Sequence, residues 1–185
     1  MTTATTIPGY VVGTWDIDAA HSDVSFSVRH MMVSKVRGRF TGVSGELVTA
    51  ERFEDSTVTA TVDATSLTTG QEQRDGHIRS ADFFDVEKYP QWAFRSTGVT
   101  AKGDDFVLAG DLTIKGVTRP VEFDLELGGF GPDAYGGTRA GFTAKTEINR
   151  NEFGVDIKMP MDGGGVVVGD KITVELEIEA VLRTA

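Results

Sequence analysis

Apolar and polar residues alternate one by one through ten short segments of this chain, between Trp15 and Leu182. In the clearest segment, residues 171–180, every even position is apolar and every odd position is polar. Successive side chains of a β-strand point to opposite faces of a sheet, so each segment has one apolar and one polar face. Ten such segments in 185 residues predict an all-β chain whose antiparallel sheet is closed, or nearly closed, around an apolar interior.

One helical pattern interrupts the strands. Thr69-Gly70-Gln71-Glu72 fits a capping box and predicts a helix over residues 71–80. This helix has few apolar residues, so we expect it on the rim of the barrel, with Phe83 and Phe84 as its anchors. Lys115-Gly116 predicts a tight hairpin. The ten expected strands are 14–18, 23–30, 35–40, 45–49, 57–63, 91–96, 105–114, 117–127, 138–149 and 171–181.

The charged residues predict the order of the last three strands. The polar faces of 117–127 and 171–181 each carry three carboxylates. Like charges placed directly opposite each other on adjacent strands are destabilising. A simple meander puts 138–149 between them, where Arg139 and Lys145 can lie against both acidic strands. We predict that order.

The composition excludes several classes of partner. The net charge is −10 and the sequence pI is about 4.7. Most of this surface repels a phosphate backbone, so we expect no nucleic-acid partner, and anionic membrane surfaces are disfavoured for the same reason. The chain has no cysteine, which removes disulfides and thiolate chemistry.

The length favours one domain, a barrel over residues 13–185 preceded by a loose or lightly docked arm over residues 1–12. The first eight residues have neither a basic segment nor a long apolar core, so they do not resemble a signal peptide. No apolar run approaches the roughly 18 residues that would span a bilayer. We therefore expect a cytoplasmic protein without an integral membrane segment.

The apolar face of the expected barrel mixes rings with very small residues. Gly38, Ala60, Gly110 and Ala144 occupy apolar-face positions among the phenylalanines. A closed sheet of about eight strands either fills with side chains or encloses one small ligand. The small residues leave room for a cavity, or they pack against the aromatic rings and leave none. The pattern alone keeps both alternatives open.

Four blocks of the sequence resemble the YceI-like family, in order and in spacing, over about residues 13–183. The first block is WDID at 15–18, HS at 21–22, VSFSVRHM at 24–31 and VRGRF at 36–40, and the second is RDGHIRSADFFD at 74–85 with YP at 89–90. The third is LTIKGVTRPV at 112–121, and the last runs from AGF at 140–142 through INR at 148–150 and FG at 153–154 to VGD at 168–170.

This resemblance implies an extended, lipocalin-like antiparallel barrel. It also implies binding of a polyisoprenoid or a similar amphiphile, such as an isoprenoid quinone or a fatty amide. The apolar-face positions that we expect to line the cavity are Phe26, Val28, Val36, Phe40, Trp92, Phe94, Phe106, Leu112, Phe123, Leu125 and Phe142, with Phe83 and Phe84 beside them.

Few polar residues are candidates for a site. His30, Arg79 and Arg150 are candidate contacts for a ligand head group, with His77 as an alternative to Arg79 on the helix. Asn149 and Glu152 predict a short helical turn, after which Phe153 plugs one end of the barrel. Gly163-Gly164-Gly165 is expected to form a mobile flap over the barrel mouth, and the three histidines show no metal-ligand spacing.

Three functional hypotheses follow. The first is a binding protein that carries, stores or sequesters a lipophilic small molecule, without a cofactor, a metal or a catalytic residue. The second is an enzyme acting on an isoprenoid or another lipid, which needs at least two polar groups converging inside the cavity. The third is a filled barrel that acts as an interaction protein. A homodimer is left open by the sequence.

Overall fold

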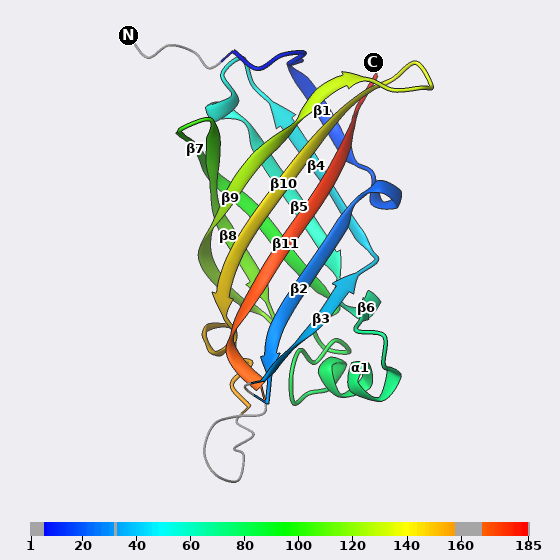
Figure 1. The fold of residues 1–185 in the computed structure, drawn as a ribbon, viewed down its shortest axis with the longest axis vertical. Helices are drawn as coiled ribbons and strands as arrows, with labels where there is room; N and C mark the ends of the chain where they lie inside the picture. Colours follow the sequence, from blue (N-terminus) through cyan, green and yellow to red (C-terminus); the bar gives the residue numbers. More distant parts are fainter. Residues whose placement is uncertain (1–5, 32, 158–167, 185) are drawn as a thin grey trace.

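The computed structural model describes residues 6–31, 33–157 and 168–184. The strands form a tall barrel with the first and last described residues at one end and the α-helix at the other (Figure 1). The strands are β1 Gly13–Ile17, β2 Asp23–His30, β3 Ser34–Phe40, β4 Val43–Thr49, β5 Thr57–Asp63, β6 Leu67–Thr68, β7 Gln91–Lys102, β8 Asp105–Ile114, β9 Val117–Pro132, β10 Thr138–Asn149 and β11 Val168–Leu182. The α-helix is α1 Glu72–Arg79, and 3-10 helices occupy Ala19–His21, Phe53–Asp55, Ala64–Ser66 and Arg150–Phe153. Among the described residues, no helix is long and apolar enough to cross a membrane.

The sheet closes on itself through eight strands. Its order runs β1-β4-β5-β7-β8-β9-β10-β11, and β11 pairs back with β1. Every pairing is antiparallel; Trp15 lies opposite Leu182 at the closing seam. This confirms the predicted all-β antiparallel barrel of about eight strands with one short helix at its rim.

The ten predicted strands form a barrel that is eight strands around, because two strands share one position at two places in the sheet: β1 with β2, and β3 with β4. The upper part of β11 pairs with β1 and its lower part pairs with β2. The turn between β1 and β2 begins at Asp18, whose side chain accepts a hydrogen bond from the Ala20 amide at 3.1 Å. On the other side of this position, β4 pairs with β1 and β3 pairs with β2, so β3 and β4 together form the next position of the sheet.

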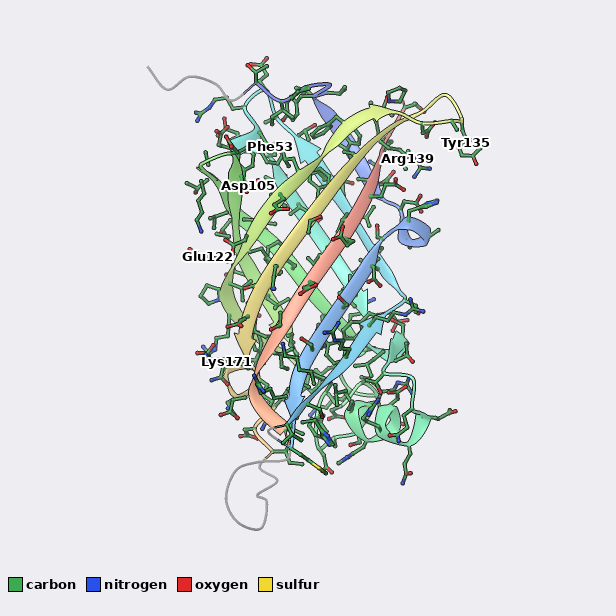
Figure 2. All side chains as sticks on the ribbon, viewed as in Figure 1. Phe53, Asp105, Glu122, Tyr135, Arg139 and Lys171 are labelled. Carbon is green, nitrogen blue, oxygen red and sulfur yellow. The ribbon has the colours of Figure 1, made fainter. Side chains whose placement is uncertain are left out.

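The meander predicted from the charges is confirmed. β10 lies between β9 and β11, and Lys145 has Asp124 and Glu175 as its two cross-strand partners. Its Nζ lies 3.5 Å from Glu175 Oε1. The guanidinium of Arg139 lies 3.0 Å from Glu179 Oε2, near the end of the barrel that holds the termini (Figure 2).

Arg139 also joins two further carboxylates outside the barrel. Its Nη1 donates to Asp18 Oδ2 at 2.8 Å and its Nε donates to Asp133 Oδ2 at 3.1 Å. The hydrogen bond from Arg139, followed by one from His21, lowers the pKa of Asp18 from 3.8 to about 2. The network therefore links the start of the chain to β10 and to the β9–β10 hairpin.

This network predicts a specific acid sensitivity. The Asp18 carboxyl is more acidic in the folded chain than in the unfolded chain, so its stabilisation is present above pH 3.8 and is lost as the pH falls through about 2. In Arg139→Gln, the pKa of Asp18 is expected to rise toward 3.8, which removes most of this pH dependence. Carboxyl NMR titration and denaturant unfolding at a series of acid pH values measure both effects.

Lys145→Gln is the matched control for that experiment. Lys145 and Glu175 are both more than half exposed, so their pair contributes little. An Arg139→Gln protein that loses stability with acid as the wild type does would contradict the role given to Asp18.

The helix α1 closes part of the end opposite the termini (Figure 1). It spans nearly the predicted range, but the capping box is wrong: the helix N-cap is Gln71, whose side chain makes no capping hydrogen bond. Gly70 has a φ of +84° and turns the chain, so the Thr69 amide donates instead to the carboxylate of Asp75 at 2.9 Å. Asp75 is thereby buried with its charge satisfied by Thr69.

Local predictions around this end are mostly confirmed. Phe83 and Phe84 are buried and anchor the segment after α1; the Phe84 and Trp92 ring centroids lie 5.0 Å apart. Lys115 and Gly116 form the tight β8–β9 hairpin with φ values of 53° and 75°. Asn149 caps the predicted turn by accepting a hydrogen bond from the Asn151 amide at 3.0 Å. The flap predicted at 163–165 lies outside the described residues.

At the other end, residues 6–12 dock onto the barrel rather than hang loose. The Tyr10 hydroxyl donates to the carbonyl of Ala50, and its ring packs edge-on against Phe130 at 5.3 Å. Thr49 is almost completely buried; its hydroxyl donates to the Val11 carbonyl at 2.7 Å and accepts from the Trp15 indole at 2.9 Å. Buried polar groups are costly unless paired, so these bonds hold the segment over this end.

Candidate ligand-binding site

A cavity of about 150 Å³ occupies the middle of the barrel. Its wall is almost entirely apolar, because the inward positions of nearly all strands carry aliphatic or aromatic residues. Several of these inward side chains, such as Phe94 and Leu176, are only partly buried; they pack against the buried core and also face the cavity. The lining residues are Ile17, Val24, Ser25, Phe26, Phe40, Val43, Leu47, Phe53, Ser56, Thr57, Val58, Ala60, Val62, Trp92, Ala93, Phe94, Val99, Leu108, Leu112, Phe123, Leu125, Phe142, Ala144, Val174, Leu176, Ile178 and Ala180.

The four small inward residues divide into two pairs. Ala60 and Ala144 line the cavity directly. Gly38 and Gly110 are each covered by a ring: a β-carbon at Gly38 would lie 2.7 Å from Phe26 Cε1, and one at Gly110 would lie 2.6 Å from Phe94 Cε2. The glycines therefore let these two rings lie along the wall, which leaves the centre of the barrel open.

Filling one of these glycine positions is expected to destabilise the barrel. In Gly110→Ala the new methyl group meets both the Phe94 ring and the Arg95 carbonyl oxygen, each at 2.6 Å. Overpacking of this kind costs about 1–3 kcal/mol. Urea unfolding measures the loss, with Gly98→Ala as the control, because nothing lies within 4 Å of a β-carbon there. Equal losses in the two variants would contradict the close approach described for Phe94.

A second cavity, also of about 150 Å³, lies at the α1 end. Its wall combines apolar residues with arginine and histidine. Phe26 belongs to both walls, so the two cavities are neighbours. The lining residues are Phe26, Val28, Arg29, His30, Val36, Arg74, His77, Ile78, Phe83, Phe84, Arg150, Val155, Val168 and Ile172.

The structure places most of the predicted site residues around these two cavities. The first cavity is lined by Phe26, Phe40, Trp92, Phe94, Leu112, Phe123, Leu125 and Phe142, and the second by Phe26, Val28, His30, Val36, Phe83, Phe84 and Arg150. His30 ends β2 and is partly buried.

Three predicted site residues line neither cavity and are corrections. Phe106 is 2% exposed, and its ring packs edge-on against Phe53 at 4.7 Å; Phe53 lines the cavity and Phe106 does not. Phe153 is buried at the turn after β10 and plugs that region without reaching either wall. Arg79 donates from Nη2 to the Leu67 carbonyl, which holds β6 and α1 together.

Sequence reasoning also missed residues of both walls. Ile17, Leu47 and Val58 face the first cavity, and their place in the alternation was a usable signal. Arg29 and Arg74 line the second cavity without such a signal. Arg29 has the phase of the outer face of β2 and its side chain is exposed, whereas Arg74 comes from α1, so their meeting at one wall could not be read from either segment.

One group of side chains on the outer face has the composition of a metal site. The ligand atoms of Asp18, His21 and Glu179 lie within 4.8 Å of one another. Arg139 donates to both carboxylates, at 2.8 Å and 3.0 Å, and already supplies the positive charge. We therefore assign the group to the ion-pair network described above.

Known proteins resemble this chain in sequence and in fold. A UPF0312 protein of Vibrio campbellii (strain ATCC BAA-1116) is 39% identical over 170 residues, which cover 91% of this chain and 86% of that protein. Two solved structures share the fold. One is BcnA of Burkholderia cenocepacia, with a TM-score of 0.76, 22% identity and coverage of 88% of this chain and 98% of that one.

The other is a polyisoprenoid-binding domain from Saccharophagus degradans implicated in plant cell wall breakdown. Its TM-score is 0.71 at 16% identity, and the match covers 94% of this chain and all of that domain. The model of the YceI-like domain matches residues 15–180, nearly the whole barrel. The chain therefore belongs to the YceI-like family.

Proposed function

We propose that this protein binds an amphiphile with an isoprenoid-type tail, such as a polyisoprenoid or an isoprenoid quinone, or a comparable fatty amide. The tail lies in the first cavity and the polar head in the second. The observation that carries the proposal is a cavity with an apolar wall beside a second one whose wall holds polar groups, with Phe26 common to both. The fold shared with a polyisoprenoid-binding domain supports it.

The energetics favour a chain-like ligand. Burying one CH₂ group contributes about 0.8 kcal/mol, so one five-carbon branched unit contributes about 4 kcal/mol at most. Association itself costs about 4–15 kcal/mol. A ligand with several such units is therefore needed for useful affinity, and an extended tail follows the long axis of the barrel better than a compact molecule does.

The role that fits this wall is to hold the ligand for transport, storage or sequestration. Its side chains act through dispersion contacts and exclusion of water. An enzyme would need a general base paired with a second polar group in reach of the ligand. Of the two histidines in the second wall, His77 has Asp82 as a partner at 3.0 Å, and Asp82 itself lines neither cavity.

Native mass spectrometry of the purified protein, followed by organic extraction, tests the proposal. We expect a bound lipid at one copy per chain, and uptake of farnesol or a longer prenyl alcohol after the lipid has been removed. A protein that carries no lipid and takes up no prenyl probe would overturn the proposal.

A further inference from the structure

Positive charge gathers in one segment of this acidic chain. Residues 24–45 run from β2 through β3 to the start of β4, and they hold Arg29, Lys35, Arg37 and Arg39. All 28 Asp and Glu residues of the chain lie outside this segment. The net charge of −10 is therefore unevenly distributed, and this segment is opposite in sign to the chain as a whole.

The strand pairing puts all four cations on the outer face of the β2–β3 hairpin. Arg29 lies directly opposite Lys35, and Arg37 and Arg39 follow at alternate positions along β3. All four are exposed, and the ion pairs between described residues include none of them. Like charges directly opposite each other on adjacent strands are destabilising. Because Arg29 and Lys35 form such a pair without an ion-pair partner among the described residues, this face is suited to an anionic partner.

The tip of the same hairpin is apolar. Val33 is 85% exposed and Met31 is 44% exposed, and neither is among the side chains that form the hydrophobic core or pack against it. The Val33 amide closes the turn by donating to the His30 carbonyl at 3.3 Å, so the backbone holds both side chains at the end of the hairpin. This tip lies at the α1 end of the barrel (Figure 1). An apolar tip and a cationic flank therefore occur together on one hairpin.

We propose that the β2–β3 hairpin docks the α1 end of the barrel onto an anionic lipid bilayer. Met31 and Val33 enter the interface between head groups and acyl chains, and the cations nearest the tip lie against the anionic head groups. The remaining acidic surface is repelled by such a bilayer, so this face alone approaches it and the barrel is oriented on contact.

A bilayer fits this surface better than a protein partner does. Two apolar side chains beside a row of cations give too little apolar area for a stable protein–protein interface, whereas a fluid bilayer needs no complementary shape. His30 and Val36 of the same hairpin line the second cavity, so docking also brings that cavity to a lipid surface. The surface goes beyond the proposed function, because docking does not require a bound ligand.

Flotation with lipid vesicles tests the docking surface. The purified protein is mixed with vesicles of phosphatidylcholine alone, and with vesicles that also contain phosphatidylglycerol. We expect binding to the second kind only, and we expect it to weaken as salt is added, because the cations lie on the exposed outer face. Each cation near an anionic bilayer contributes about a fivefold gain in affinity. The double variant Lys35→Gln/Arg37→Gln is therefore expected to bind about 25-fold more weakly.

Arg95→Gln/Lys102→Gln is the matched control for that double variant. It also removes one arginine and one lysine from exposed positions of a single strand, β7, which is not a neighbour of β2 or β3 in the sheet. The control is expected to bind the anionic vesicles as the wild type does. Thermal unfolding verifies that both double variants fold.

An introduced tryptophan reports whether the tip enters the bilayer. Trp15 and Trp92 are buried in the barrel, so we expect their emission to stay constant on docking. In Val33→Trp, the emission is expected to shift to shorter wavelengths with the anionic vesicles. Tyr135→Trp is the control, because Tyr135 is 90% exposed and lies at the other end of the barrel (Figure 2). No shift is expected there.

Several outcomes would overturn the docking surface. Equal binding to both kinds of vesicle would refute the role of the cations, and equal losses in the two double variants would refute the location. A shift in both tryptophan variants, or in neither, would refute insertion of the tip. Binding to soluble polyglutamate as tight as that to anionic vesicles would make an acidic protein the partner instead. A protein that docks but holds no prenyl ligand would overturn the proposed function and leave this surface intact.

Discussion

Replacing Ala144 with phenylalanine is expected to weaken binding of a prenyl ligand strongly while the barrel remains folded. Ala144 is 4% exposed and points from β10 into the first cavity, opposite Leu125 on β9 and Leu176 on β11. The new ring occupies the space of about one five-carbon unit of the tail. Losing such a unit costs up to about 4 kcal/mol, so the affinity is expected to fall by up to about a thousandfold.

The control for this variant makes the same substitution on the outer face. Ala109 lies on β8 between the inward positions of Leu108 and Gly110, and it lines neither cavity. Ala109→Phe is expected to bind the prenyl probe as the wild type does. Binding is measured by titration with a fluorescent prenyl probe, and folding by thermal unfolding. An Ala144→Phe protein that is folded and binds normally would show that the ligand lies elsewhere.

Truncating Phe40 is expected to lower the free energy of unfolding by about 3–5 kcal/mol, the usual cost of removing a buried aromatic side chain. Phe40 is 2% exposed, and its ring lies 4.6 Å from the Trp92 centroid and 5.7 Å from that of Phe26. Because it lines the first cavity, Phe40→Ala also enlarges the space available to a ligand. Its preference is expected to shift toward longer prenyl tails.

Phe106→Ala separates the two effects of that change. Phe106 is also 2% exposed, but it packs on Phe53 and lines neither cavity. We expect a similar loss in denaturant unfolding and an unchanged order of affinity across prenyl alcohols of increasing length. A shift in tail preference common to both variants would mean that lost stability, rather than the shape of the cavity, changes binding.

The strand pattern was sufficient for the fold because alternation is a local property of the chain. It found every wall strand, and the like-charge rule found the order of β9, β10 and β11. The pattern fails where glycines interrupt it. β7 continues past a register shift between Ser96 and Gly98, and β9 continues past Gly128 to Pro132. β6, of two residues, is too short to show any period.

The candidate site was predicted less completely, because facing inward is not the same as facing empty space. Phe94 and Phe106 share the inward pattern, yet Phe94 faces the cavity beside Gly110, whereas Phe106 packs against Phe53 and does not line the cavity. Likewise, Arg79 and Arg74 occupy the same helix, and only Arg74 lines a cavity. These differences depend on neighbours that are distant in the sequence.

By itself, then, the sequence determined the chain's two-faced strands, its closed antiparallel sheet and the apolar character of the interior, since each follows from residues one or two positions apart. Only the tertiary structure decided that two rings lie over glycines and leave the centre open, and that arginines from β2, α1 and the turn after β10 meet at one wall. Closure of the barrel and the docking of α1 bring these groups together, and that packing is encoded in no single segment.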